Sequence, residues 1–187
     1  EVVKQIPGDH VGIHAHNDTE QAVANSRAAG RAGARQIQGT LNGLGERCGN
    51  ANLCSLIPTL KLKREFAETL ETGISDERLA SLMQVSRSLD DILNRAPNRH
   101  AAYVGESAFV TKTGIHASAV MKDPHTYEHV LPENVGNHRK VLVSDQAGGS
   151  NVMAEPDDPG RACERSESKR TWLVWGWRCS GSASSVS

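Results

Sequence analysis

The chain has 187 residues, a formal net charge of −1 at pH 7 and a sequence pI of about 6.8. Its lysines and arginines are scattered and no long apolar run occurs, so we expect neither nucleic acid nor a membrane as a partner. The four cysteines, Cys48, Cys54, Cys163 and Cys179, form no Cys-x-x-Cys pair, which favours reduced thiols in a cytoplasmic protein.

Residues 11–16 are predicted to form a short strand, which the chain reaches soon after it begins at Glu1. This early start indicates a sequence that begins within a domain. Because alternate residues of a strand face the same side, His14 and His16 project together and can bind one divalent metal ion. The alternative is that both are ordinary strand-end histidines with hydrogen-bond partners.

A helix is expected after this strand. Asp18 is a good N-cap, Gln21 completes the spacing of a capping box, and Gly33 is placed to end the helix. Residues 35–40 then form a predicted second strand, and a second helix is expected from about residue 51 to 63. This alternation with short connections predicts a parallel α/β sheet.

Between the second strand and its helix lies a glycine-rich loop, residues 41–50, which holds Glu46 and Asn50. In a (β/α)8 barrel, functional groups lie at the carboxyl ends of the strands and in the loops that follow. By that rule His14, His16 and Asn50 meet at one rim as three neutral ligands, and a complete metal site needs a carboxylate from elsewhere. The alternative for Asn50 is an N-cap of the following helix.

The second half of the chain has a different character. Ser75 caps a predicted helix that Pro97 stops, and its apolar stripe is most simply core or helix–helix packing. Residues 101–110 are expected to be irregular, 113–129 to form a small helical module, and 139–143 an extended segment. The stripe consists of Leu79, Leu82, Met83, Leu89, Ile92 and Leu93.

We therefore divide the chain into three parts. Residues 1–72 are the βα units, residues 73–153 are a mostly helical linker with its subdomains, and residues 154–187 are a disordered tail. The tail is rich in serine and arginine and contains all three tryptophans, so an out-of-frame translation would explain its composition.

The predicted site residues lie in motifs that extend over much of the chain, at residues 12–18, 38–52, 103–109, 113–117 and 122–129. Together these motifs resemble the alpha-isopropylmalate/homocitrate/citramalate synthase family, and most closely its citramalate synthase branch. The resemblance covers roughly residues 9–153. It implies an α/β fold: the last two βα units of a TIM barrel and a mostly helical linker module, so that the barrel is incomplete.

The resemblance also implies a reaction. It is a Claisen-type condensation in which acetyl-CoA, as co-substrate, adds to an α-keto acid, and the thioester is then hydrolysed. The keto acid is pyruvate in the citramalate branch, which serves isoleucine biosynthesis. Alternatives are a 2-isopropylmalate or homocitrate synthase, a metal-dependent lyase of the same barrel superfamily, or a truncated fragment without catalysis.

Site residues follow from the same resemblance. His14, His16 and Asn50 match ligands of a divalent metal (Mg²⁺, Mn²⁺ or Zn²⁺) that activates the keto acid. Glu46 matches an acidic loop residue, a candidate for orienting a ligand or handling a proton.

The resemblance assigns two further catalytic residues to the second half of the chain. His116 and Tyr127 match residues that move over the site, often from a partner subunit, which implies a homodimer for the full-length protein. The family's metal-binding Asp, its substrate-clamping Arg and its keto-acid pocket have no counterpart in this sequence. We therefore expect the 187-residue polypeptide to be a fragment that is inactive alone.

Overall fold

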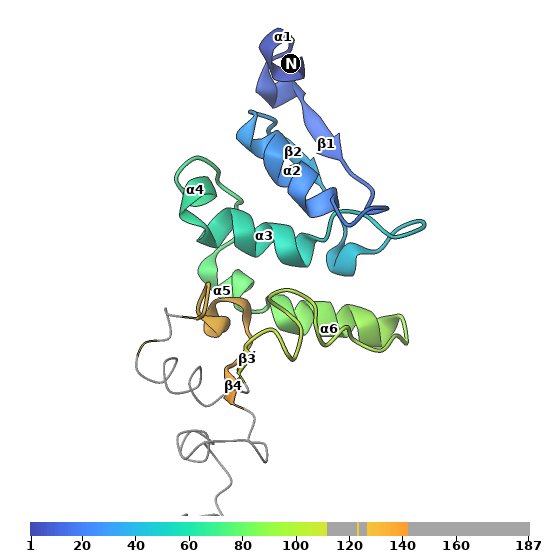
Figure 1. Cartoon of the computed structure of the whole chain (residues 1–187), viewed down its shortest axis with the longest axis vertical. Helices are drawn as coiled ribbons and strands as arrows, with labels where there is room; N and C mark the ends of the chain where they lie inside the picture. The colour runs from blue at the N-terminus through green and yellow to red at the C-terminus, as the bar shows by residue number, and fades with distance from the viewer. Residues whose placement is uncertain (112–122, 124–126, 142–187) are drawn as a thin grey trace, which may run out of the picture.

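The computed structural model describes residues 1–111, 123 and 127–141. The predictions for His116, for most of the module at 113–129 and for the tail at 154–187 lie outside the described residues. Figure 1 shows the described elements in chain order, from the β1–α2–β2 unit at the top, through α3, to α6 below it.

The amino-terminal half forms the predicted alternation of strands and helices. Strands β1 and β2 pair in parallel, with Gly12 opposite Gln36 and His14 opposite Gln38. Helix α2 connects them and α3 follows, so the prediction of a parallel α/β unit is confirmed. The elements are α1 (Val2–Gln5), η1 (Gly8–His10), β1 (Gly12–His14), α2 (Ala22–Arg31), β2 (Gln36–Gln38), η2 (Leu41–Gly43), α3 (Leu53–Leu62) and α4 (Arg64–Ala67).

Helix α2 packs on the sheet through small residues, because Ala22, Ser26 and Gly30 are its buried positions. A Cβ on Gly30 would lie 3.4 Å from Cδ1 of Ile37, so the helix lies close to β2. Gly33, with a φ of +106°, follows the helix and turns the chain into β2, as its sequence position predicted.

The predicted N-cap of α2 is wrong. The helix begins at Ala22, and it is Asn17 that accepts a hydrogen bond from the Ala22 N–H, over 3.2 Å. Asp18 instead makes an ion pair with Arg47. Because the Asp18 carboxylate is bound to Arg47, it does not cap α2. The helix starts at Ala22, three residues later than a cap at Asp18 would require.

The predicted helix that starts at Ser75 consists of two helices in the structure, α5 (Asp76–Leu79) and α6 (Leu82–Ile92). Ser75 caps the first, and its Oγ accepts the Arg78 N–H over 3.4 Å. At the break, the Ser81 N–H and hydroxyl both donate to the Arg78 carbonyl, and Ser81 has a φ of −94° and a ψ of 0°, outside the helical range.

The amino-terminal end of the apolar stripe enters the main core, and the other end does not. Leu79, Leu82 and Met83 are buried, whereas Ile92 is 81% exposed. The prediction that the stripe packs in a core is therefore confirmed for its amino-terminal residues and not for Ile92. The main cluster of buried residues joins α3, α5 and α6 to the segment after α6; it consists of Cys54, Leu79, Leu82, Met83, Tyr103, Val104, Phe109 and Val135.

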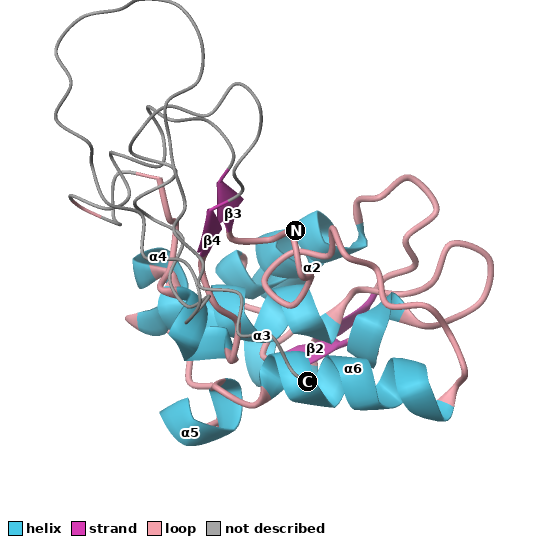
Figure 2. Cartoon of the chain, turned by 90° about the horizontal axis from the view of Figure 1, so that it is seen from below, coloured by secondary structure: helices cyan, strands magenta, loops and turns pink. Residues whose placement is uncertain are grey.

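Residues 101–110 are irregular up to the short strand β3 (Val110–Thr111), which pairs in parallel with β4 (Lys140–Val141). The extended segment expected at 139–143 is thus confirmed for its described part. Figure 2 shows this second pair of strands away from β2 and α6. In the chain, η4 (Pro132–Val135) lies between β3 and β4. Among the described residues, no helix has the length and apolar character needed to span a membrane.

Candidate metal centre at the ends of two parallel strands

The pairing of β1 with β2 fixes the first candidate ligand. His14 lies opposite Gln38, and its ring Nδ1 is 3.2 Å from the Gln38 side-chain oxygen Oε1. An amide oxygen only accepts hydrogen bonds, so Nδ1 carries the hydrogen and Nε2 keeps its lone pair. A histidine bound through one nitrogen and oriented through the other is the usual arrangement in metal sites.

His16 lies beside His14, as the strand pattern predicted. The two ring centroids are 5.2 Å apart and the rings meet edge to face at 69°. Both histidines are exposed, so their rings are open to a ligand. The structure thus brings the predicted His-x-His pair together at the end of β1.

Asn50 is brought to the same place by an isolated antiparallel bridge with His16. Two backbone hydrogen bonds flank the bridge, from Asn17 N–H to the Gly49 carbonyl (2.8 Å) and from Ala51 N–H to the Ala15 carbonyl (3.0 Å). In this arrangement the opposed pair makes no hydrogen bond of its own, and its side chains are as close as a β-ladder allows.

The carboxamide oxygen of Asn50 is buried and has no hydrogen-bond partner among the described residues. A buried oxygen without a donor is costly, and a bound cation would remove that cost. The alternative role as a helix cap is taken by Asn52, whose side chain accepts the Cys54 N–H over 2.9 Å. The unpartnered oxygen agrees with the ligand role predicted for Asn50, which stays a prediction together with those of His14 and His16.

The glycines of the loop explain why this oxygen can lie there. A Cβ on Gly45 would be 2.8 Å from Cγ of Asn50, so the amide rests directly on the glycine backbone. A Cβ on Gly49 would be 2.0 Å from the Gly43 carbonyl oxygen, and Gly49 has a φ of +88°. Both positions require glycine for the loop to close.

An ion pair joins the loop of Asn50 to the end of β1. Arg47 donates to both carboxylate oxygens of Asp18, from Nε over 3.0 and 3.1 Å and from Nη2 over 2.9 Å. The guanidinium lowers the pKa of the Asp18 carboxyl below its ordinary value. Glu46, the predicted acidic residue, is exposed, and its carboxylate is 3.7 Å from Nη1 of Arg47.

The donor set is neutral. Within the part of the chain that the structure describes, no three His, Cys, Asp or Glu side chains gather into a metal-binding group. Two imidazoles and a carboxamide are left, and hard divalent cations favour at least one carboxylate besides such donors.

Tyr127 lies apart from these residues. It is 52% exposed and lines a cavity of about 250 Å³ with Phe109, Val110 and His129. The neighbouring Glu128 carboxylate is mostly buried and pairs with Arg139, whose pKa it raises. The structure therefore does not bring Tyr127 to the predicted metal ligands.

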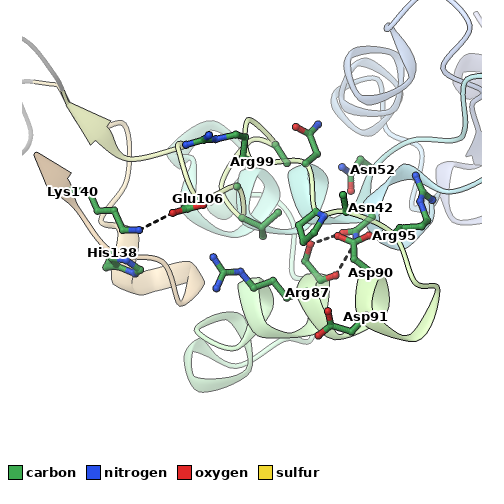
Figure 3. A pocket seen from close by; sticks show the side chains of 17 residues that line it. Asn42, Asn52, Arg87, Asp90, Asp91, Arg95, Arg99, Glu106, His138 and Lys140 are labelled. Carbon is green, nitrogen blue, oxygen red and sulfur yellow. Dashed lines mark hydrogen bonds and ion pairs between the residues drawn. The ribbon is translucent and has the colours of Figure 1, made fainter. Parts of the chain in front are cut away.

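The pocket in Figure 3 is separate from the candidate metal centre and encloses about 680 Å³. It lies between α6, residues 95–106 and β4, and its side chains carry both signs of charge. Lys140 and Glu106 form an ion pair of 3.0 Å across it, which lowers the pKa of Glu106. None of the predicted site residues lines it.

Sequence reasoning missed Gln38 and the Asp18–Arg47 pair. Gln38 could have been found from the strand register. His14 and Gln38 are each the last residue of a three-residue strand, and the parallel pairing places them opposite each other. Nothing comparable in the sequence pairs Asp18 with Arg47, since both lie in loops.

Two family models match the chain. Residues 1–87 match the family described as HMGL-like, and residues 103–158 match the homocitrate synthase post-HMGL domain-like family. These two matches agree with the resemblance inferred from the motifs.

Curated relatives extend this similarity over most of the chain. An (R)-citramalate synthase of Synechocystis sp. is 54% identical over 155 residues, which cover 83% of this chain and 27% of the relative. The (R)-citramalate synthase of Geobacter sulfurreducens is 53% identical over 148 residues, covering 79% of this chain and 27% of the relative. A 2-isopropylmalate synthase of Campylobacter concisus is 38% identical over 157 residues, covering 83% of this chain and 30% of the relative. The chain thus spans about a quarter of the length of the relatives it matches, and the predicted resemblance is confirmed.

Proposed function

We propose, because this chain is related in sequence to the alpha-isopropylmalate/homocitrate/citramalate synthase family, that it carries part of the active site of a citramalate-forming enzyme. The reaction joins acetyl-CoA to pyruvate: the acetyl methyl loses a proton, its carbon attacks the keto carbon, and water cleaves the thioester to release CoA. The single observation that supports a site here is the buried Asn50 oxygen opposite His16, which has no hydrogen-bond partner among the described residues.

In this proposal His14, His16 and Asn50 hold a divalent cation. When bound, such a cation polarises the keto carbonyl toward attack. Gln38 accepts a hydrogen bond from Nδ1 of His14, which would leave Nε2 of His14 as the nitrogen available to a metal. The Asp18–Arg47 pair holds the two loops together and so limits how far the histidines and Asn50 can separate.

Proton transfer is assigned to other residues. Removal of a weakly acidic methyl proton needs a positioned base, and His116 and Tyr127 are the candidates that the family resemblance gives. Support for Tyr127 is its exposure beside a cavity. Glu46 is proposed to orient a ligand or to handle a proton, supported by its place in the same loop as Asn50. A homodimer and a cytoplasmic location stay part of the proposal.

Pyruvate is preferred as the keto acid because the citramalate synthases are more similar to this chain than the 2-isopropylmalate synthase, at 54% against 38% identity. We expect no turnover from the 187-residue polypeptide alone, because its three candidate ligands are neutral. This expectation fails if CoA is released from acetyl-CoA and pyruvate at ordinary enzymatic rates.

A chimera tests the proposed active-site residues of this chain. The matching segment of the Synechocystis relative would be replaced by the 155 aligned residues of this chain. We expect the chimera to release CoA from acetyl-CoA and pyruvate, and to lose this activity in His14→Ala or His16→Ala. His10→Ala, which changes an exposed histidine before β1, is the matched control and should leave activity unchanged. An active chimera that tolerates both ligand substitutions would refute the site.

A further inference from the structure

Asn42 makes a set of hydrogen bonds that the proposed reaction does not use. Its carboxamide Nδ2 donates to the backbone carbonyl of Ser86 over 2.9 Å, and its Oδ1 accepts from the Ser86 hydroxyl over 2.6 Å. The Cys54 thiol donates to the same oxygen over 3.3 Å. One side chain in the glycine-rich loop is thereby bound to both the backbone and the side chain of one residue in α6.

These bonds lie in a protected place. Ser86 is 6% exposed and Cys54 is fully buried, and burial raises the pKa of the Cys54 thiol. Figure 3 shows Asn42 at the edge of the 680 Å³ pocket, next to α6. Asn42 itself is partly buried, and because its partners Ser86 and Cys54 are shielded from water, these bonds can hold the loop in one position.

The backbone of Asn42 is also suited to this role. Its φ of +55° is in the left-handed region, which Asn adopts more readily than most side chains. The residue that turns the loop is therefore the same residue that attaches the loop to α6.

A short path leads from Asn42 to the candidate ligand Asn50. The next residue, Gly43, accepts the Asn50 N–H through its carbonyl oxygen over 3.1 Å. The same carbonyl is in contact with Gly49, where no Cβ would fit. Movement of Asn42 would thus move Gly43, and with it the backbone that sets where the Asn50 carboxamide points.

We infer that Asn42 is a positioning residue through which helix α6 holds the glycine-rich loop and fixes the Asn50 carboxamide for its ligand. The metal part of this inference rests on the proposed function, whereas the coupling of α6 to Asn50 does not. The helix that follows the βα units would therefore control the geometry of the centre at the end of β1, without touching the ligand itself.

Two measurements on the full 187-residue chain test this inference. The first is amide hydrogen exchange at the Asn50 N–H, which reports the bond to Gly43. The second is broadening of the His14 and His16 ring proton signals by Mn²⁺, which suits the weak binding expected of neutral donors. Ser86→Ala removes one hydrogen bond to Asn42 while favouring the helix. Ser88→Ala, at an exposed position of the same helix, is the matched control.

We expect Ser86→Ala to speed Asn50 exchange about five- to tenfold, the loss that one net hydrogen bond implies, and to weaken Mn²⁺ binding by a similar factor. Ser88→Ala should change neither. Asn42→Asp keeps the shape and the left-handed preference, but it places a carboxylate oxygen against the Ser86 carbonyl in place of the Nδ2 donor. It should therefore speed Asn50 exchange at least as much as Ser86→Ala. Circular dichroism confirms that each variant is folded.

The outcomes separate the two ideas. Equal Asn50 exchange in Ser86→Ala and Ser88→Ala overturns the coupling. Faster exchange in Ser86→Ala with no Mn²⁺ broadening even in the unmodified chain supports the coupling and refutes the metal role proposed above. Faster exchange with unchanged Mn²⁺ affinity overturns the inference that the helix acts on the ligand.

Discussion

His16 and Asn50 face each other across an antiparallel bridge, although one lies just after β1 and the other ends a glycine-rich loop. Their side chains come from segments that backbone hydrogen bonds on both sides hold together. The buried Asn50 oxygen, for which the described part of the chain offers no hydrogen-bond donor, is therefore held in place by the fold, independently of any ligand.

Asn50→Asp should strengthen metal binding. The substitution keeps the shape of the side chain and turns a neutral donor into a carboxylate, the ligand type that hard divalent cations prefer. We expect the dissociation constant for Mn²⁺ to fall about tenfold, measured by paramagnetic broadening of the His14 and His16 ring signals. Asn52→Asp, at the helix cap, is the matched control, and equal tightening in both variants would argue against Asn50 as a ligand.

Gly45→Ala should disrupt the centre. Its new methyl group would lie 2.8 Å from Cγ of Asn50, so the carboxamide must move. We expect a loss of stability of about 1–3 kcal/mol, measured by urea denaturation, and loss of detectable Mn²⁺ binding. Gly73→Ala is the control. Nothing lies within 4 Å of a Cβ at that position, so this substitution adds only the backbone strain of a φ of +66°. Intact Mn²⁺ binding in Gly45→Ala would show that the amide is not a ligand.

Gln38→Leu should weaken metal binding about 10- to 100-fold, because His14 loses the acceptor that orients its ring. Gln38→Glu retains an acceptor at the same place and should bind at least as well as the unmodified chain. Isothermal titration with Zn²⁺ measures both. If Gln38→Leu and Gln38→Glu bind alike, the bond to His14 has no part in the site.

Cys54 should resist alkylation in the folded chain at pH 8.5, whereas Cys48 should react. Burial raises the pKa of the Cys54 thiol above its ordinary value of 9.0, and Cys48 is exposed. Peptide mass spectrometry after iodoacetamide treatment distinguishes the two. Rapid labelling of Cys54 under native conditions would mean that α3 and the glycine-rich loop separate readily.

The same raised pKa gives stability a pH dependence. The folded state favours the neutral thiol, so this contribution is complete below pH 9 and is lost as the pH rises through the folded-state pKa. Urea midpoints measured from pH 7 to 10 should therefore fall at the alkaline end, and fall less in Cys54→Ala. Cys48→Ser should follow the unmodified chain.

Much of the amino-terminal half was predictable because its elements are local. The small-residue helix, the glycine after it and the two short strands follow from spacing alone, and the strand period placed His14 and His16 on one face. The helix start was mispredicted because Asp18 has a partner, Arg47, that lies in a distant loop.

The remaining errors have the same physical origin. Gln38 and Asn42 act through side-chain contacts with residues far along the chain, and no periodicity records such contacts. The break between α5 and α6 falls at Ser81, and no glycine or proline marks this position in the sequence. His116 lies outside the described residues, so its assignment stays a prediction.

Within the described residues, the sheet of β1 and β2 has only two strands, so each strand has one edge whose backbone groups are unpaired by another strand. Such edges pair readily with any extended segment they meet. The polypeptide should therefore self-associate as its concentration rises. A short peptide that adds a third strand should keep the polypeptide monomeric. Sedimentation at increasing concentration, with and without the peptide, would measure the self-association.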